Sequence, residues 1–113
     1  MRRGEVWTVR DPAYAGKARP AVAVQSDVVS ATFESAIMVA LTTFDSAAAR
    51  NRVRLDSTPA NGLKEASYVM TEKPFTVRAE RLGMRVGVLD EGDLLRVSRS
   101  LASVLGITVE DLA

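Results

Sequence analysis

Three features of the sequence could do chemistry together if they met at one edge of a sheet. Arg19 stands before Pro20, at the start of the apolar run in "KARPAVAVQSD". Thr42 and Thr43 close the apolar segment "AIMVALTT", and Glu72 stands near the end of "SYVMTEKP". A guanidinium binds two phosphate oxygens in a planar fork, a hydroxyl donates a further hydrogen bond, and a carboxylate can accept a proton. None of the three residues is specific for one reaction by itself.

Each of these features also has a plain structural interpretation. An Arg before a strand is commonly a solvated loop charge, Thr suits β geometry, and Glu72 beside Lys73 could be an exposed pair worth little. The elements that position the residues therefore decide between the two interpretations.

Composition narrows the chemistry. The chain has 113 residues, 47% of them hydrophobic and 26% charged, which is typical of one ordinary globular domain spanning 1–113. It contains no Cys and no His, so thiolate metal sites, disulfides and imidazole bases are excluded. Any catalyst must use Arg, Lys, Asp, Glu, Ser, Thr or Tyr, and we expect no cofactor.

The net charge of +1 conceals an asymmetry. Residues 1–20 carry five basic and two acidic side chains, whereas residues 90–113 carry two basic and five acidic ones. A basic N-terminal part can attract phosphate. No signal peptide is recognisable, and the longest apolar run, Ala36 to Leu41, is too short to span a bilayer, so we expect a cytoplasmic protein without membrane contact.

Short β-type segments dominate the chain and predict a mainly β (α+β) fold. The expected strands are Glu5 to Val9, Ala21 to Ser26, Ser35 to Thr43, Arg50 to Asp56, Ala66 to Lys73 and Met84 to Val86. Residues 27–35 could hold a short helical turn, and Asn61-Gly62 is typical of a tight turn. We expect these strands to curl into a compact sheet or barrel.

One amphipathic helix is predicted near the C-terminus. Asp90 is a candidate N-cap and Gly106 a candidate C-terminal stop. The apolar stripe between them consists of Leu94, Val97, Leu101, Val104 and Leu105.

The order of these segments resembles the MazF/PemK (Kid) family of toxin endoribonucleases over nearly the whole chain. The segments that carry the resemblance are "RRGEVW", "RPAVAVQSD", "MVALTT", "GLKEASYVMTEKPFTV", "RLGMRVGVL" and "LASVLGI". The resemblance implies a small, curled, SH3-like β barrel with a C-terminal helix, of the MazF/CcdB type, found as a homodimer. It also implies metal-independent cleavage of single-stranded RNA, which leaves 2′,3′-cyclic phosphate and 5′-hydroxyl ends, and inhibition by a cognate antitoxin.

The resemblance also assigns catalytic residues. The family Arg falls on Arg19, the family Thr on Thr42, and the acidic position on Glu72. Some members use an Arg where this chain has Met70, so the assignment depends more heavily on Arg19. Which groups move the protons stays open between Glu72, Arg19 and water, because an Arg is a poor base near neutral pH.

RNA must also be held. We predict RNA contacts for Tyr14, Lys17, Thr43 and Lys73, although Tyr14 could equally pack on the barrel. Arg50, Arg52 and Arg54 could bind RNA, but solubilising the strand is the favoured interpretation.

Two other functions remain open. A CcdB-type toxin binds DNA gyrase, but the Trp near the C-terminus that such a contact uses is absent here. The second alternative is a protein that has lost cleavage and only binds RNA or antitoxin, since Met70 replaces a catalytic Arg of some family members.

Overall fold

The computed structural model describes residues 1–10, 17–30 and 34–113. Its strands form a six-stranded antiparallel sheet in the order β4-β5-β3-β2-β1-β6. The bounds are β1 Glu5–Arg10, β2 Ala18–Ala23, β3 Ser35–Thr42, β4 Val53–Leu55, β5 Ser67–Arg78 and β6 Leu82–Val88. The helices are α1 Asp27–Ser30 and α2 Glu91–Leu105, with single 3₁₀ turns at Ala79–Arg81 and Glu110–Leu112. The predicted mainly β class is confirmed.

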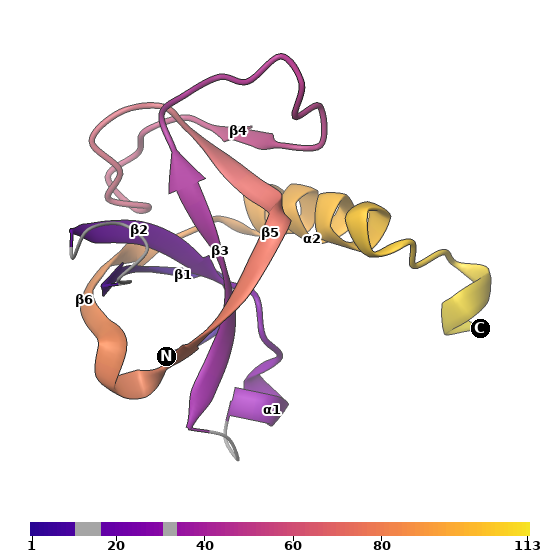
Figure 1. Ribbon diagram of the computed structural model, residues 1–113, viewed down its shortest axis with the longest axis horizontal. Coiled ribbons are helices and arrows are strands. Elements are labelled where there is room, and N and C mark those ends of the chain that lie inside the picture. The colour runs from indigo at the N-terminus through magenta and orange to yellow at the C-terminus, as the bar shows by residue number, and fades with distance from the viewer. Residues whose placement is uncertain (11–16, 31–33) are drawn as a thin grey trace.

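The sheet is strongly curled, and the segment between β4 and β5 bridges to β6 (Figure 1). The carbonyl of Ala60 in this segment accepts a hydrogen bond of 2.9 Å from the backbone N–H of Val88. Gly62 is required there, because its φ is +69° and a Cβ would lie 2.1 Å from the carbonyl oxygen of Val86. The predicted barrel is therefore a half-barrel whose edge strands are joined through a loop.

Helix α2 begins and ends where the sequence predicts. The side chain of Asp90 accepts a hydrogen bond of 2.7 Å from the backbone N–H of Asp93, which caps the N-terminus. Gly106 adopts φ 72° and ends the helix in the left-handed conformation. The helix packs on β4 and β5, and its C-terminal end projects away from the sheet (Figure 1). No helix in the described part of the chain is long and apolar enough to cross a membrane.

The sheet has a core on each face. On the α2 side the core contains Val6, Val22, Val39, Leu41, Val53, Leu55, Val69 and Val97, with Leu94 and Leu101 packed against it. On the other face a smaller core contains Val9, Ala21, Ala23, Ala36, Met38 and Val77. Because side chains alternate along a strand, these two lists show which face each strand position uses.

Several strand boundaries differ from the prediction, among them the ends of β4 and β6, and two of the differences affect the candidate site. Strand β2 begins at Ala18, so Arg19 lies inside the strand and not before it. The ladder between β2 and β3 begins only at Ala21, in keeping with the missing N–H of Pro20. Strand β5 continues through Pro74 to Arg78, beyond the predicted end at Lys73.

The pairing of β3 with β5 contains a wide irregularity. Val39 pairs with Pro74, whereas Leu41 pairs with Val69, so four residues of β5 face one residue of β3. Such a bulge bends a strand and increases its twist. The bend carries Glu72.

Candidate active site

Arg19 and Thr42 are brought together by the register of neighbouring strands. Strand β2 pairs with β3 through Ala21 opposite Ala40 and Val22 opposite Val39. Continued by two residues, this register sets Arg19 opposite Thr42. Directly opposed side chains in an antiparallel pair have Cβ atoms about 4.5–5.5 Å apart on the same face. The observed pairs end at Ala21 and Ala40, and the same register continued to the strand ends places Arg19 and Thr42 on one face of adjacent strands.

The face that carries this pair is the one opposite to α2. Arg19 pairs directly with Val9, which belongs to the smaller core. Arg19 is exposed, and Thr42 is half-buried at the end of β3. Both side chains thus start from rigid strands, but at a strand end that solvent reaches.

The hydroxyl of Thr42 is oriented by the backbone. Its Oγ1 accepts a hydrogen bond of 3.2 Å from the backbone N–H of Phe44. A hydroxyl that accepts in this way keeps its own proton to donate. Thr42 is therefore suited to donate a hydrogen bond to an anionic oxygen beside Arg19.

Glu72 lies in a different environment. Its Oε2 receives a hydrogen bond of 2.8 Å from Nη2 of Arg52 and one of 3.1 Å from Nε of the same residue. Nδ2 of Asn51 donates to Oε1 at 3.2 Å. The Arg52 guanidinium is the largest cause that lowers the pKa of Glu72, and it outweighs the opposing effect of partial burial. The carboxylate is ionised at neutral pH and is a weaker base than an ordinary Glu.

A buried hydrogen-bond network continues from Glu72 to helix α2. Thr71 is fully buried, and its hydroxyl receives a 2.9 Å hydrogen bond from Nδ2 of Asn51. The same hydroxyl lies 2.7 Å from Oγ of Ser100 on α2. Ser100 in turn donates to the backbone carbonyl of Asn51. The network fixes the bend of β5 against the helix.

The predicted RNA-binding residues are spread over the surface. Thr43 lines a cleft of about 330 Å³ together with Ala18, Pro20 and the start of β5. Lys17 and Lys73 are exposed. Tyr14 lies outside the described residues. The contacts of these side chains with RNA therefore remain predictions.

Several partners of Glu72 were not identified from the sequence. The sequence favours Arg52 as a solvated side chain, like Arg50 and Arg54, but in the structure its side chain is only 11% exposed and binds the carboxylate of Glu72. Asn51 and Ser100 carry no local pattern that marks them, because they meet only through the loop before β4 and the packing of α2. Among the described residues, no group of three or more acidic side chains gathers in a way that could hold a metal.

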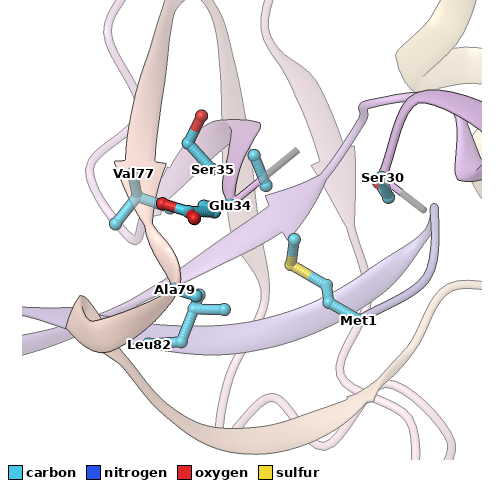
Figure 2. Close-up of a pocket in the computed structure, with 8 residues that line it drawn as sticks. Met1, Ser30, Glu34, Ser35, Val77, Ala79 and Leu82 are labelled. Atoms are coloured by element: carbon cyan, nitrogen blue, oxygen red, sulfur yellow. The ribbon is translucent and has the colours of Figure 1, made fainter. Parts of the chain in front are cut away.

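Figure 2 shows a second cavity, of about 150 Å³. It is lined by Met1, Val77, Ala79, Leu82 and residues near the start of β3, including Glu34 and Ser35. Strand β3 starts at Ser35 and ends at Thr42, so this cavity lies at the opposite end of the strand from the candidate pair. It contributes no residue to the site.

The described residues form a small, curled, antiparallel sheet with one long C-terminal helix, in a chain whose sequence contains no His. Residues 2–105 match the family described as the PemK-like, MazF-like toxin of type II toxin–antitoxin systems. The chain therefore belongs to this family. The class predicted from the sequence, an endoribonuclease toxin, is confirmed, and the gyrase-binding alternative is disfavoured.

Individual relatives agree with the family assignment. The chain is 43% identical over 108 residues to the probable endoribonuclease MazF of Mycolicibacterium smegmatis, and the match covers 95% of this chain and 98% of that protein. The fold is similar to that of a mycobacterial endoribonuclease solved with its cognate antitoxin, with TM-score 0.80, 22% identity and coverage of 96% and 97%. It is also similar to MazF from Deinococcus radiodurans, with TM-score 0.77, 16% identity and coverage of 95% and 97%.

Proposed function

We propose that this protein cuts single-stranded RNA without a metal ion, and that Arg19 and Thr42 form the centre of its active site. The observation that supports the proposal is the register of β2 and β3, which pairs Ala21 with Ala40 and, continued by two residues, brings Arg19 opposite Thr42. The pair supplies a planar cation and a neutral donor for the same phosphate group.

In the proposed reaction the 2′-hydroxyl of the RNA attacks the adjacent phosphorus atom. A bond forms from the 2′-oxygen to phosphorus, the bond from phosphorus to the 5′-oxygen breaks, and the 2′-hydroxyl proton is lost while the 5′-oxygen gains one. The products are a 2′,3′-cyclic phosphate and a 5′-hydroxyl. DNA lacks the nucleophile, which restricts cleavage to RNA.

Arg19 and Thr42 act on the charge that develops during this attack. Negative charge gathers on the non-bridging oxygens of the phosphate. Arg19 can bind both of these oxygens, and the Thr42 hydroxyl can donate a hydrogen bond to one of them. Donors held in place before the reaction are often the largest catalytic contribution. Both residues start from strands whose inner positions are buried, so their backbone needs no rearrangement.

Glu72 has a positioning part in this proposal. Its lowered pKa and its hydrogen bonds to Arg52 and Asn51 make it a poor acceptor for the 2′-hydroxyl proton. It holds the loop before β4 and the bend of β5 in place. We infer that solvent takes the proton.

We also propose a cognate antitoxin, a homodimeric state and a cytoplasmic location. The mycobacterial relative was solved with its cognate antitoxin, and MazF of D. radiodurans with MazE. The family assignment supports the same kind of partner for this chain.

The deciding experiment incubates the purified protein with long, mixed-sequence single-stranded RNA, once in EDTA and once with Mg²⁺, beside Arg19→Ala. The proposal expects discrete cuts by the wild type alone, with 5′-hydroxyl ends. An absence of cuts from folded, antitoxin-free protein on varied RNA would overturn it and favour a protein that only binds RNA or antitoxin. Cuts that disappear only in EDTA would overturn the metal-independent mechanism.

A further inference from the structure

The row that contains Arg19 and Thr42 continues across two more strands. Thr42 pairs directly with Tyr68 on β5, and Tyr68 pairs directly with Arg54 on β4. The four residues occupy β2, β3, β5 and β4, which are consecutive strands in the sheet. Thr42, Tyr68 and Arg54 are directly paired, and Arg19 joins them when the register of β2 and β3 is continued by two residues, so all four side chains start from the same face. No local sequence pattern marks Tyr68.

The two added residues have the chemistry that single-stranded nucleic acid needs. Tyr68 is half-buried, so its ring is anchored by the sheet but partly accessible. Arg54 has a side chain that is 54% exposed. Its guanidinium donates a hydrogen bond of 2.5 Å to the carboxylate of Asp56 and interacts with the Tyr68 hydroxyl. The ring can stack on a base, and the cation can bind a phosphate.

We propose that Tyr68 and Arg54 form a second nucleotide subsite, next to the phosphate that is cut. Tyr68 stacks on a base beside the cleaved bond, and Arg54 binds a neighbouring phosphate. This inference rests on the proposed function, because it takes Arg19 and Thr42 as the point of cleavage. It makes Tyr68 the residue that holds the base beside the cut, with a modest preference for the bases that stack best.

The dimensions of the sheet agree with this arrangement. Neighbouring strands lie about 4.8 Å apart, so three steps from Arg19 to Arg54 span about 14 Å. RNA that crosses the strands would therefore meet Arg19 and Arg54 with different phosphates. Tyr68 lies between them in the row, where a base can be held.

Asp56 is the acidic partner of Arg54, and its charge can be removed to test the subsite. Its side chain is 77% exposed, and an exposed ion pair contributes little to stability. A phosphate can therefore replace the carboxylate as the partner of Arg54. Removing the charge of Asp56 should strengthen RNA binding, whereas removing Arg54 should weaken it.

Strand β5 offers a matched control. Arg78 also has an acidic residue two positions later, with its guanidinium 3.9 Å from the carboxylate of Glu80, and both side chains are exposed. Arg78 pairs with Ser35. By strand alternation Ser35 starts from the face opposite to that of Thr42. Arg78→Ala therefore removes the same charge from the other face.

The test measures binding and cleavage separately. Binding is measured by fluorescence anisotropy with a labelled, mixed-sequence single-stranded DNA oligonucleotide, which cannot be cut because it has no 2′-hydroxyl. Cleavage is measured on a short RNA that carries the sequence cut most often by the wild type, and the sequences of the cut ends are recorded. The variants are Tyr68→Ala, Tyr68→Phe, Arg54→Ala, Arg54→Gln, Asp56→Asn and Arg78→Ala, each checked by thermal unfolding.

We expect Tyr68→Ala to weaken binding about tenfold, in line with the loss of one stacked base, and Tyr68→Phe to stay within about twofold of the wild type. Arg54→Ala and Arg54→Gln should weaken binding about three- to fivefold. They should also reduce the slope of log K against log salt concentration by about 0.7, the value for one phosphate contact on a single strand. Asp56→Asn should bind more tightly, and Arg78→Ala should match the wild type. In cleavage, Tyr68→Ala should raise KM more than it lowers kcat. The cut ends should then show a weaker preference for one base beside the cut.

The inference is overturned if the Arg54 variants bind the DNA probe as Arg78→Ala does, even if Tyr68→Ala fails to fold. It is also overturned if a folded Tyr68→Ala keeps both its affinity and its base preference. A wild type that binds the probe but cuts no RNA contradicts the proposed function, whereas the Arg54 and Arg78 comparison still decides whether the subsite exists.

Discussion

The Arg19–Thr42 pair and the Glu72 network are both polar, and both depend on the strands around β3, but they are built for different purposes. The hydrogen-bonding groups of the network are satisfied inside the protein, through Asn51, Arg52 and the hydroxyls that reach α2. Arg19 and Thr42 instead lie where solvent, and hence a ligand, can reach them. A saturated network stabilises the fold, whereas donors at an exposed strand end can act on a substrate.

The largest expected effect separates the two regions most clearly. Arg19→Ala should lower RNA cleavage by roughly 10³-fold, because an Arg on transition-state phosphoryl charge contributes on this scale. Its thermal unfolding should stay close to that of the wild type, since Arg19 is exposed. Single-turnover cleavage and calorimetry measure the two quantities. A similar loss in Arg78→Ala would show that general positive charge, and not the position of Arg19, is what matters.

Thr42 tests whether the hydroxyl contributes as a donor. Thr42→Val keeps the shape of the side chain, removes the hydroxyl and should reduce kcat roughly 10²-fold, as for other preorganised donors. Thr42→Ser should retain most of the activity, because it keeps the hydroxyl that the Phe44 N–H orients. Equal rates for the Val and Ser variants would remove Thr42 from the mechanism.

Glu72→Gln should lower the stability of the protein more than its cleavage activity. The ion pair with Arg52 is only partly exposed, at 11% and 25% of the two side chains, so its loss should lower the free energy of unfolding by about 1–2 kcal/mol. We expect less than a tenfold fall in cleavage, measured at a temperature where the variant is folded. Urea unfolding and steady-state kinetics give the two values. If cleavage falls as far as in Arg19→Ala while stability is unchanged, Glu72 is a catalytic base.

The smallest effect is a dependence of stability on pH. The pKa of Glu72 is lowered in the folded protein, chiefly by Arg52, from an ordinary value of 4.5. The ion pair therefore stabilises the fold fully above pH 4.5, and the stabilisation is lost as the pH falls through the lowered pKa. The stability difference between wild type and Glu72→Gln should shrink as the pH is lowered from about 7 to about 3. A difference that stays constant in urea titrations across this range would contradict the ion-pair explanation.

The strands and the helix were largely predictable because local patterns encode them. The alternation around Val53 and Leu55, the apolar run that became β3, and the cap residues Asp90 and Gly106 all predicted their elements correctly. Several strand ends were predicted wrongly, and the two that matter for the site were set by pairing. Arg19 belongs to β2 because β1 pairs with it, and β5 passes through Pro74 because a bulge absorbs the irregularity.

By itself, the sequence determined the family and the residue types available for chemistry, since motif order and the absence of His and Cys are properties of the chain alone. Only the tertiary structure decided which of those residues are neighbours. Thr42 and Tyr68 are 26 positions apart yet directly paired, and Glu72 meets Arg52 across a loop. Strand register and helix packing are set by the fit of the whole core, so no local pattern could assign Glu72 to a hydrogen-bond network or pair Tyr68 with Thr42 and Arg54.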